Sequence, residues 1–265
     1  MITQLIAEAR KIVLKYGSNT LADKEGKINL PLLDEYAAQI SCLKNTGKQI
    51  VVVSSGAQAA GLSTMHRWAR KKDIQYRQAL CAVGQVELMA AWGRAFEKTG
   101  LHIAQILLTQ EDFGDPIRTL NMRNTLFTLV DEGIIPVINE NDTVSVEEIK
   151  IGDNDTLAAQ SAILWSADLL ILFSDIDGLY TKNPKEFPDA ELVEEIKNIA
   201  EAKKGVVIGS PNSLGTGGIA TKISAAERAF PYGISTIIAN GSRPRALEAL
   251  AAGNQKGTAF IAEGK

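Results

Sequence analysis

Two lysines stand beside glycine-containing segments, a combination that can hold a phosphate group. Lys15 ends an apolar run and is followed by Gly17, and Lys222 lies one turn into an expected helix that follows the glycine-rich stretch 213–220. Backbone amides of such turns and of helix N-termini attract anions, and a lysine adds a full positive charge. Taken alone, Lys15 is explained equally well as a solvated lysine at the end of a strand.

The glycine-rich stretch does not match the common nucleotide-binding loops. It contains G-x-G-x-x-A at Gly215, Gly217 and Ala220, but the segment before it, from Ser210 to Ser213, is not a strand. A dinucleotide fingerprint belongs in the first strand-to-helix turn of the chain, and no Walker A pattern occurs anywhere. A nucleotide must therefore be held by a different arrangement.

Four further segments carry polar side chains. Ser55 follows an apolar run, residues 139–142 read Asn-Glu-Asn-Asp, residues 153–155 read Asp-Asn-Asp, and Ser174-Asp175 follows the most apolar run. The amides and carboxylates of 139–142 suit the ammonium and carboxylate groups of an amino acid. The pair Asp153 and Asp155 could hold a metal or orient nearby lysines, and Ser174-Asp175 could border a purine or ribose. Helix capping and tight turns are the structural alternatives at each segment.

Short apolar strands alternate with helices, which predicts a mostly parallel sheet covered on both faces. The expected strands are 11–15, 49–54, 103–109, 135–139, 169–174, 234–239 and 258–262. The expected helices are 31–45, 75–99, 121–132, 156–166, 190–204 and 221–232. Ligands of such sheets bind at the carboxyl ends of the strands, where the polar segments begin. We expect one compact domain over residues 1–265.

Composition excludes several classes of function. The 265 residues are 45% hydrophobic with a net charge of −3 and no block of basic residues, so neither a nucleic-acid surface nor a membrane span is expected. No signal peptide is recognisable, and a cytoplasmic location is expected. Cys42 and Cys81 are expected to be buried free thiols. The two histidines, His66 and His102, adjoin no nucleophile, which indicates chemistry that works without histidine.

Together these segments resemble the amino-acid kinase family. The family's motifs appear in its usual order, from Lys15 to about Gly241, as residues 53–57, 82–85, 136–142, 151–155, 177–180 and 215–218. The closest resemblance is to members that phosphorylate glutamate. It implies a three-layer αβα sandwich with a mostly parallel central sheet, and ATP-dependent phosphorylation of the glutamate side-chain carboxylate as the first step of proline biosynthesis. Tyr16 departs from the pattern, where a smaller apolar residue is usual.

The resemblance also implies roles for individual residues. Lys15 and Lys222 would contact ATP and the transferring phosphoryl group, and Asp155 would position both lysines. The implied glutamate-binding residues are Ser55, Asn139, Asp142 and Asn154. The implied ATP-binding residues, besides Lys15, are Gly17, Ser174, Asp175, Thr216, Gly217, Gly218, Ile219, Ala220, Thr221 and Lys222.

Cofactors and partners follow from the same resemblance. Mg²⁺ would bridge the ATP phosphates, with no protein ligand assigned. A homo-oligomer and feedback inhibition by proline are implied, with glutamate bound mainly by the N-terminal part and ATP by the C-terminal part. Many bacterial relatives carry a C-terminal PUA domain, which we expect to be absent because about two dozen residues follow Gly241.

Other functions stay open at this point. The family also contains kinases for N-acetylglutamate, aspartate, carbamate and UMP, which share the phosphate machinery but differ in the acceptor pocket. The acidic and amide residues at 139–142 and 153–155 favour free glutamate, because a carboxylate is useful against an unblocked ammonium group. A non-catalytic sensor on the same fold is the alternative from another class. Retention of both Lys15 and Lys222 argues against it.

Overall fold

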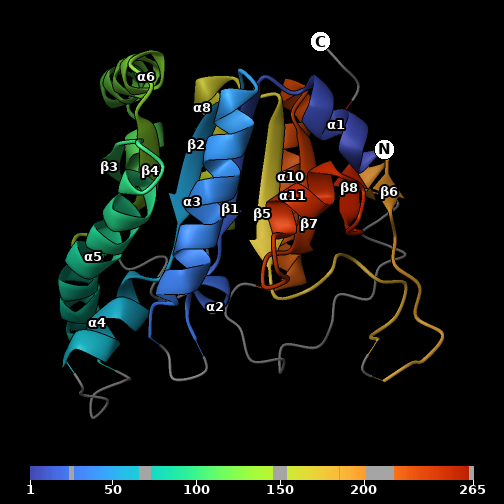
Figure 1. Cartoon of the computed structure of the whole chain (residues 1–265), viewed down its shortest axis with the longest axis horizontal. Coiled ribbons are helices and arrows are strands. Elements are labelled where there is room, and N and C mark those ends of the chain that lie inside the picture. Colours follow the sequence, from blue (N-terminus) through green and yellow to red (C-terminus); the bar gives the residue numbers. More distant parts are fainter. Residues whose placement is uncertain (24–26, 66–72, 146–153, 185, 201–217, 263–265) are drawn as a thin grey trace.

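A computed structural model of the chain describes residues 1–23, 27–65, 73–145, 154–184, 186–200 and 218–262. Its centre is a sheet with the strand order β3-β4-β2-β1-β5-β7-β8-β6 (Figure 1). The strands are β1 (Lys11–Tyr16), β2 (Gln49–Ser54), β3 (Ile103–Leu108), β4 (Ile135–Glu140), β5 (Leu169–Ser174), β6 (Glu195–Ile196), β7 (Ser235–Asn240) and β8 (Thr258–Phe260). Neighbours are parallel except β7 and β8, so the expected mostly parallel sheet is confirmed.

Helices cover both faces of this sheet. They are α1 (Ile2–Glu8), α2 (Ser18–Leu21), α3 (Leu30–Asn45), α4 (Ala57–Met65), α5 (Ile74–Glu97), α6 (Pro116–Asp131), α8 (Asp155–Trp165), α10 (Ile219–Ala229) and α11 (Ala246–Ala251), with 3₁₀ turns η1 (Gln110–Phe113) and η2 (Phe230–Tyr232). Residues of α1, α3, α5 and α11 share one buried apolar cluster, and residues of α6, α8 and α10 share another. The three-layer αβα arrangement is therefore confirmed.

The side chains of β1 show why both faces are covered. Ile12, Leu14 and Tyr16 point into the first cluster, and Val13 points into the second. Successive side chains of a strand lie on opposite faces, so a run that is apolar throughout must be buried on both. This places β1 in the middle of the sheet, between β2 and β5.

One expected helix is wrong. Residues 190–198 are not helical, and this stretch contains the short strand β6 (Glu195–Ile196), where Glu195 pairs with Ala259 of β8. The apolar residues Leu192, Ile196 and Ile199 recur at a helical spacing, but pairing with a strand distant in sequence overrides this local pattern. A helical assignment appears only at residues 199–200, and residues 201–204 lie outside the described part.

Two other expectations differ from the structure, and three expected residues fall outside its described part. Cys42 is exposed on α3 rather than buried, whereas Cys81 is buried, and both thiols are free. Helix α6 begins at Pro116, five residues before the expected start at Asn121, because Asp115 caps it by accepting from the backbone of Ile117 and Arg118. The expected site residues Thr216 and Gly217, together with His66, fall outside the described residues.

The carboxyl ends of β1, β2, β4, β5 and β7 lie at one edge of the sheet, the lower edge in Figure 1. Helices α2 and α4 begin at this edge, directly after β1 and β2. The parallel sheet thus brings together polar residues that are far apart in sequence. Within the described residues, no helix has both the length and the apolar character needed to cross a membrane.

Helices α4 and α5 touch backbone to backbone at two glycines. A Cβ atom added at Gly84 would lie 1.8 Å from the carbonyl oxygen of Ala57, and one added at Gly61 would lie 1.9 Å from that of Leu80. No side chain fits at either position without moving a helix. This contact fixes α5, whose inner face reaches the edge of the sheet where the polar segments meet.

We predict that Gly84→Ala lowers the stability of the protein by about 3 kcal/mol, because the methyl group must push α4 and α5 apart. For a chain of this size the melting temperature should fall by roughly 6–12 °C, measured by calorimetry or circular dichroism. The control is Gly93→Ala in the same helix, where the added atom meets only the Ile103 side chain at 4.0 Å. Equal stability of the two variants would contradict the close-contact explanation.

Candidate functional site

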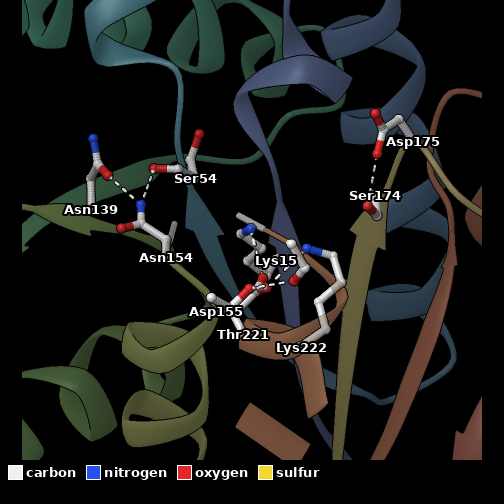
Figure 2. Close-up of polar contacts among 10 residues, drawn as sticks. Lys15, Ser54, Asn139, Asn154, Asp155, Ser174, Asp175, Thr221 and Lys222 are labelled. Carbon is white, nitrogen blue, oxygen red and sulfur yellow. Dashed lines mark hydrogen bonds and ion pairs between the residues drawn. The ribbon is translucent and has the colours of Figure 1, made fainter. Parts of the chain in front are cut away.

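A buried carboxylate joins two lysines at the carboxyl edge of the sheet. Asp155 is the first residue of α8 and is 0% exposed. Its Oδ1 lies 2.7 Å from Nζ of Lys15 at the end of β1, and its Oδ2 lies 2.9 Å from Nζ of Lys222 in α10 (Figure 2). The hydroxyl of Thr221 donates to the same Oδ2 at 3.0 Å. Three elements far apart in sequence therefore meet at one carboxylate.

The charges of this group make it receptive to an anion. Lys15 and Lys222 bring two ammonium groups to one point, and their side chains are only 3% and 4% exposed. Isolated buried charges are costly, so the two lysines depend on the Asp155 carboxylate between them. The carboxylate also lies at a helix N-terminus, where the helix dipole stabilises it. Two adjacent ammonium groups are a suitable site for the oxygens of a phosphate group.

The start of α10 and the turn after β1 leave space beside the lysines. Gly218 is the N-cap of α10, and its carbonyl oxygen lies 2.7 Å from Thr221 Oγ1, as an alternative acceptor to Asp155 for the one hydroxyl hydrogen. A Cβ atom at Gly17 would lie 3.6 Å from Nζ of Lys15, so a larger side chain there would occupy the space next to the ammonium group. Of the expected phosphate loop, Gly218 to Lys222 are described and lie on this side of the site.

Three side-chain amides form a hydrogen-bonded chain on the other side of Lys15. Asn154, the N-cap of α8, donates through Nδ2 to Oδ1 of Asn139 at 2.7 Å, and Asn139 donates through Nδ2 to Oε1 of Gln85 at 2.7 Å. Asn154 Nδ2 also lies 3.4 Å from the backbone oxygen of Ser54. This amide chain (Gln85, Asn139, Asn154) links α5, β4 and α8, and Figure 2 shows two of its members beside Ser54.

Several buried polar atoms near the amide chain have no hydrogen-bond partner among the described residues. They are Ser55 Oγ, Asp142 Oδ1, Asn154 Oδ1 and Gln85 Nε2. Each such atom costs about 1–3 kcal/mol when it is buried unpaired, so native proteins keep few of them. The set contains both donors and acceptors, as the site of a small zwitterionic ligand requires.

Burial raises the pKa of the Asp142 carboxyl from 3.8 to about 6, against the opposing effects of a hydrogen bond from the Cys81 thiol and the charge of Arg77. Asp142 is therefore ionised at neutral pH but protonates in mildly acidic solution. Gln78 of α5 donates to its backbone oxygen at 3.1 Å and holds the turn that carries it. This carboxylate is the acidic group available to a ligand's ammonium group.

The opposite flank of Lys15 carries Ser174 and Asp175 at the end of β5. Ser174 is buried, Asp175 is exposed, and the hydroxyl of the first donates to the carboxylate of the second at 3.1 Å. Because the strand order is β4-β2-β1-β5, Asn139, Ser54 and Ser174 lie on two sides of Lys15, as Figure 2 shows. The two expected binding regions thus flank the lysines.

Most of the sequence-predicted residues therefore meet at one edge, and one contributor was missed. Gln85 belongs to the motif at 82–85, but its contact with Asn139 joins residues 54 positions apart and left no local signal. The described histidine, His102, lies at the start of β3, at the opposite edge of the sheet. Among the described residues no group of three or more His, Cys, Asp or Glu side chains could hold a metal ion.

Comparison with known proteins agrees with this geometry. Residues 10–240 match the amino acid kinase family. The glutamate 5-kinase of Alkaliphilus metalliredigens is 59% identical over 262 residues, which are 99% of each chain. That of Geobacter sulfurreducens is 42% identical over 261 residues, which are 98% of this chain and 70% of that protein.

Solved structures share the fold at much lower identity. The carbamate kinase from Giardia lamblia bound to AMP-PNP has a TM-score of 0.66 at 17% identity and covers 97% of this chain and 100% of its own. The UMP kinase from Ureaplasma parvum has a TM-score of 0.65 at 13% identity and covers 95% and 98%. The chain therefore belongs to the amino acid kinase family and, within it, groups with the glutamate 5-kinases.

Proposed function

We propose that this protein transfers the γ-phosphoryl group of ATP to the side-chain carboxylate of glutamate, which yields glutamyl 5-phosphate and ADP and begins proline biosynthesis. The observation that carries the proposal is the pair of lysines, Lys15 and Lys222, held by Asp155 between two flanking sets of polar residues. The glutamate 5-kinases at 59% and 54% identity over nearly the whole chain support the choice of substrate.

The reaction needs no general base. A carboxylate is already ionised at neutral pH, so one of its oxygens attacks the γ-phosphorus while the bond from that phosphorus to the β–γ bridging oxygen breaks. No proton moves, and the bridging oxygen leaves on ADP. The protein's task is to hold two anions in line and to stabilise charge on the transferring group. Lys15 and Lys222 supply that charge, and Asp155 keeps both ammonium groups in place.

On the acceptor side, Ser55, Asp142 and Asn154 hold glutamate, with Asn139 behind them. The Asp142 carboxylate accepts from the α-ammonium group, the Ser55 hydroxyl donates to a carboxylate, and Asn154 lines the pocket beside the lysines. Ser55 Oγ, Asp142 Oδ1 and Asn154 Oδ1 lack hydrogen-bond partners within the described part of the chain, which is the property a substrate pocket requires. An acetylated amine would lose its charge and one donor, so N-acetylglutamate is a poorer fit.

On the nucleotide side, Gly17 leaves room beside Lys15, and Ser174 and Asp175 line the pocket. The residues proposed to bind the ATP phosphates are Thr216, Gly217, Gly218, Ile219, Ala220, Thr221 and Lys222, of which Gly218 to Lys222 lie at the start of α10 and the first two lie outside the described residues. Magnesium enters as part of the nucleotide substrate, bound mainly through phosphate oxygens and water. The Asp155 carboxylate is already engaged by two lysines, so no protein ligand is assigned.

Further properties belong to the same proposal. We propose that residues 1–265 form a single kinase domain whose N-terminal part binds mainly glutamate and whose C-terminal part binds mainly ATP. The protein acts in the cytoplasm as a homo-oligomer, and proline inhibits it. These properties rest on the resemblance to the family.

The purified protein should release ADP from ATP and magnesium when glutamate is supplied, and hydroxylamine should trap the acyl phosphate as a hydroxamate. N-acetylglutamate, aspartate, carbamate and UMP serve as comparison acceptors in the same coupled assay. Glutamate should give the highest kcat/KM, because only it presents both the free ammonium group and a side-chain carboxylate of this length. Turnover of N-acetylglutamate without turnover of glutamate would overturn the choice of substrate.

Lys222→Met should lower kcat by roughly 10²–10³-fold, the typical cost of removing one charge-stabilising donor. The KM for glutamate should change little, because the lysine contacts the phosphoryl group rather than the amino acid. Steady-state kinetics checks both values. Lys256→Met removes a lysine that is 75% exposed and paired with Glu194, and it should keep normal kinetics. A kcat for Lys222→Met within twofold of normal would remove Lys222 from the mechanism.

The kcat/KM for glutamate should fall about tenfold per unit as the pH drops below about 6, because protonated Asp142 cannot pair with an ammonium group. The side chain of free glutamate titrates near 4.3, well below the pH at which kcat/KM begins to fall, so its own protonation does not cause this acidic limb of the pH profile. Asp142→Asn should lower kcat/KM at pH 8 and remove the limb. An unchanged limb in this variant would show that another group titrates.

Stability gives a second readout of Asp142. Its pKa is raised in the folded protein, so the folded state binds the proton more tightly than the unfolded chain does. The ionised carboxylate therefore costs stability above about pH 6, by roughly 2–3 kcal/mol, and the cost shrinks as the pH falls toward 4. Asp142→Asn should melt at a higher temperature than the natural protein at pH 8 and lose this advantage in acid.

A further inference from the structure

Gln85 takes no part in the proposed phosphoryl transfer, yet it forms one end of the amide chain. It lies on α5, is only 9% exposed, and accepts a hydrogen bond of 2.7 Å from Asn139. The same face of α5 carries Gln78, which donates to the turn that bears Asp142. One helix, fixed against α4 by Gly84, therefore touches both halves of the acceptor pocket.

A backbone group fixes the direction of every hydrogen bond in the amide chain. The N–H of Glu140 donates to the Asn139 side chain at 2.9 Å, so the atom that it meets must be the oxygen. The nitrogen of Asn139 consequently faces α5, on the side away from Asn154 in Figure 2, and Gln85 must present its oxygen there. On the other side, Asn154 must present its nitrogen to the Asn139 oxygen. No amide in the chain can flip without losing a hydrogen bond.

Because the hydrogen bonds run in this fixed direction, one donor is left over at one end of the amide chain and one acceptor at the other end. Gln85 Nε2 and Asn154 Oδ1 are buried, and neither has a partner among the residues that the structure describes. Asn154 precedes Asp155 directly, whereas Gln85 is two hydrogen bonds farther from the lysines. The spare donor therefore lies at the end of the pocket remote from phosphoryl transfer. A substrate carboxylate that does not react is the group that needs a donor there.

We propose that Gln85 is a positioning and specificity residue of the acceptor pocket. Its Oε1 holds Asn139 and, through it, Asn154, and its Nε2 donates to the non-reacting α-carboxylate of the acceptor. The inference rests on the proposed phosphorylation of glutamate. It adds that the enzyme recognises the α-carboxylate as a charged group through α5, and that a neutral group at this position is rejected.

The test compares two acceptors that share the reacting carboxylate. Glutamate carries a charged α-carboxylate, and its α-amide, isoglutamine, carries a neutral amide there. Kinetics with both acceptors are measured for the natural protein, Gln85→Leu, Gln85→Glu and the control Gln75→Glu, which alters an exposed residue of the same helix. A buried hydrogen bond to a charged group is worth enough to shift binding by roughly 10–100-fold.

The natural protein should prefer glutamate over isoglutamine by a large factor in kcat/KM. Gln85→Leu should reduce that preference at least tenfold, mainly through a higher KM for glutamate, while the KM for ATP stays within about twofold. Gln85→Glu keeps an oxygen for Asn139 but offers a negative charge in place of the donor. It should therefore lose the preference as fully as Gln85→Leu, yet retain more activity with isoglutamine. Gln75→Glu should behave as the natural protein does.

Equal losses with both acceptors would show that Gln85 only supports the fold, and an unchanged preference would show that it does not meet the α-carboxylate. Either result overturns the inference. If Gln85→Leu melts well below the natural protein, Gln85→Met, which is unbranched and of similar length, replaces it. Absence of activity on glutamate in the natural protein would instead refute the proposed function, so the two failures are distinguishable.

Discussion

The carboxylate of Asp155 is the constraint on which the rest of the structure depends. Two buried ammonium groups repel each other, and they can be held together only by a negative charge between them. Lys15 comes from β1, Lys222 from α10 and Asp155 from the first turn of α8, so these elements must meet at one point. The packing of α8 against α10, behind the centre of the sheet, follows from this requirement as much as from their apolar faces. Two ammonium groups held at one point make the site suitable for an anion.

The order of strands places the two proposed binding regions on opposite sides of the lysines. The groups proposed to hold the acceptor lie at the ends of β4 and β2, Lys15 lies near the end of β1, and Ser174 ends β5, in the order in which these strands lie in the sheet. A parallel sheet puts all these ends at one edge, so in the proposed function the acceptor binds on one side of the lysines and the nucleotide on the other. Because a carboxylate acceptor is already ionised, this arrangement leaves little else for the protein to do. That accounts for a site in which the described residues include no histidine.

Much of the framework could be read from the sequence, because it depends on local patterns. The bounds of β2 and β5 agree with the expected strands, since each contains a run of four or five apolar residues that ends at a serine. The helix expected at 190–204 is wrong over residues 190–198, because pairing of β6 with β8 depends on residues about sixty positions away. Helix α4 was not expected, since its small residues serve the close contact with α5 rather than an apolar stripe.

The functional site could be predicted from the sequence only in part. Lys15 and Lys222 stood out because lysine beside glycine suits phosphate, but the residues alone left Asp155 as a helix cap, a metal ligand or a partner of the lysines. Only the resemblance to the family favoured the last of these, and in the structure the Asp155 carboxylate contacts both ammonium groups. The amide chain could not be predicted from the sequence, because the direction of its hydrogen bonds is set by the backbone N–H of Glu140, which donates to Asn139 Oδ1.

The most direct test of the central claim is a double-mutant cycle on kcat with Lys15→Met, Lys222→Met and the double variant. If Asp155 makes the two lysines act as one unit on the transferring phosphoryl group, the second substitution should add little to the loss caused by the first, as in other catalytic groups that act together. The double variant should then be slower than either single variant by less than about tenfold. Losses that simply multiply would mean that the lysines act independently, which would contradict the account.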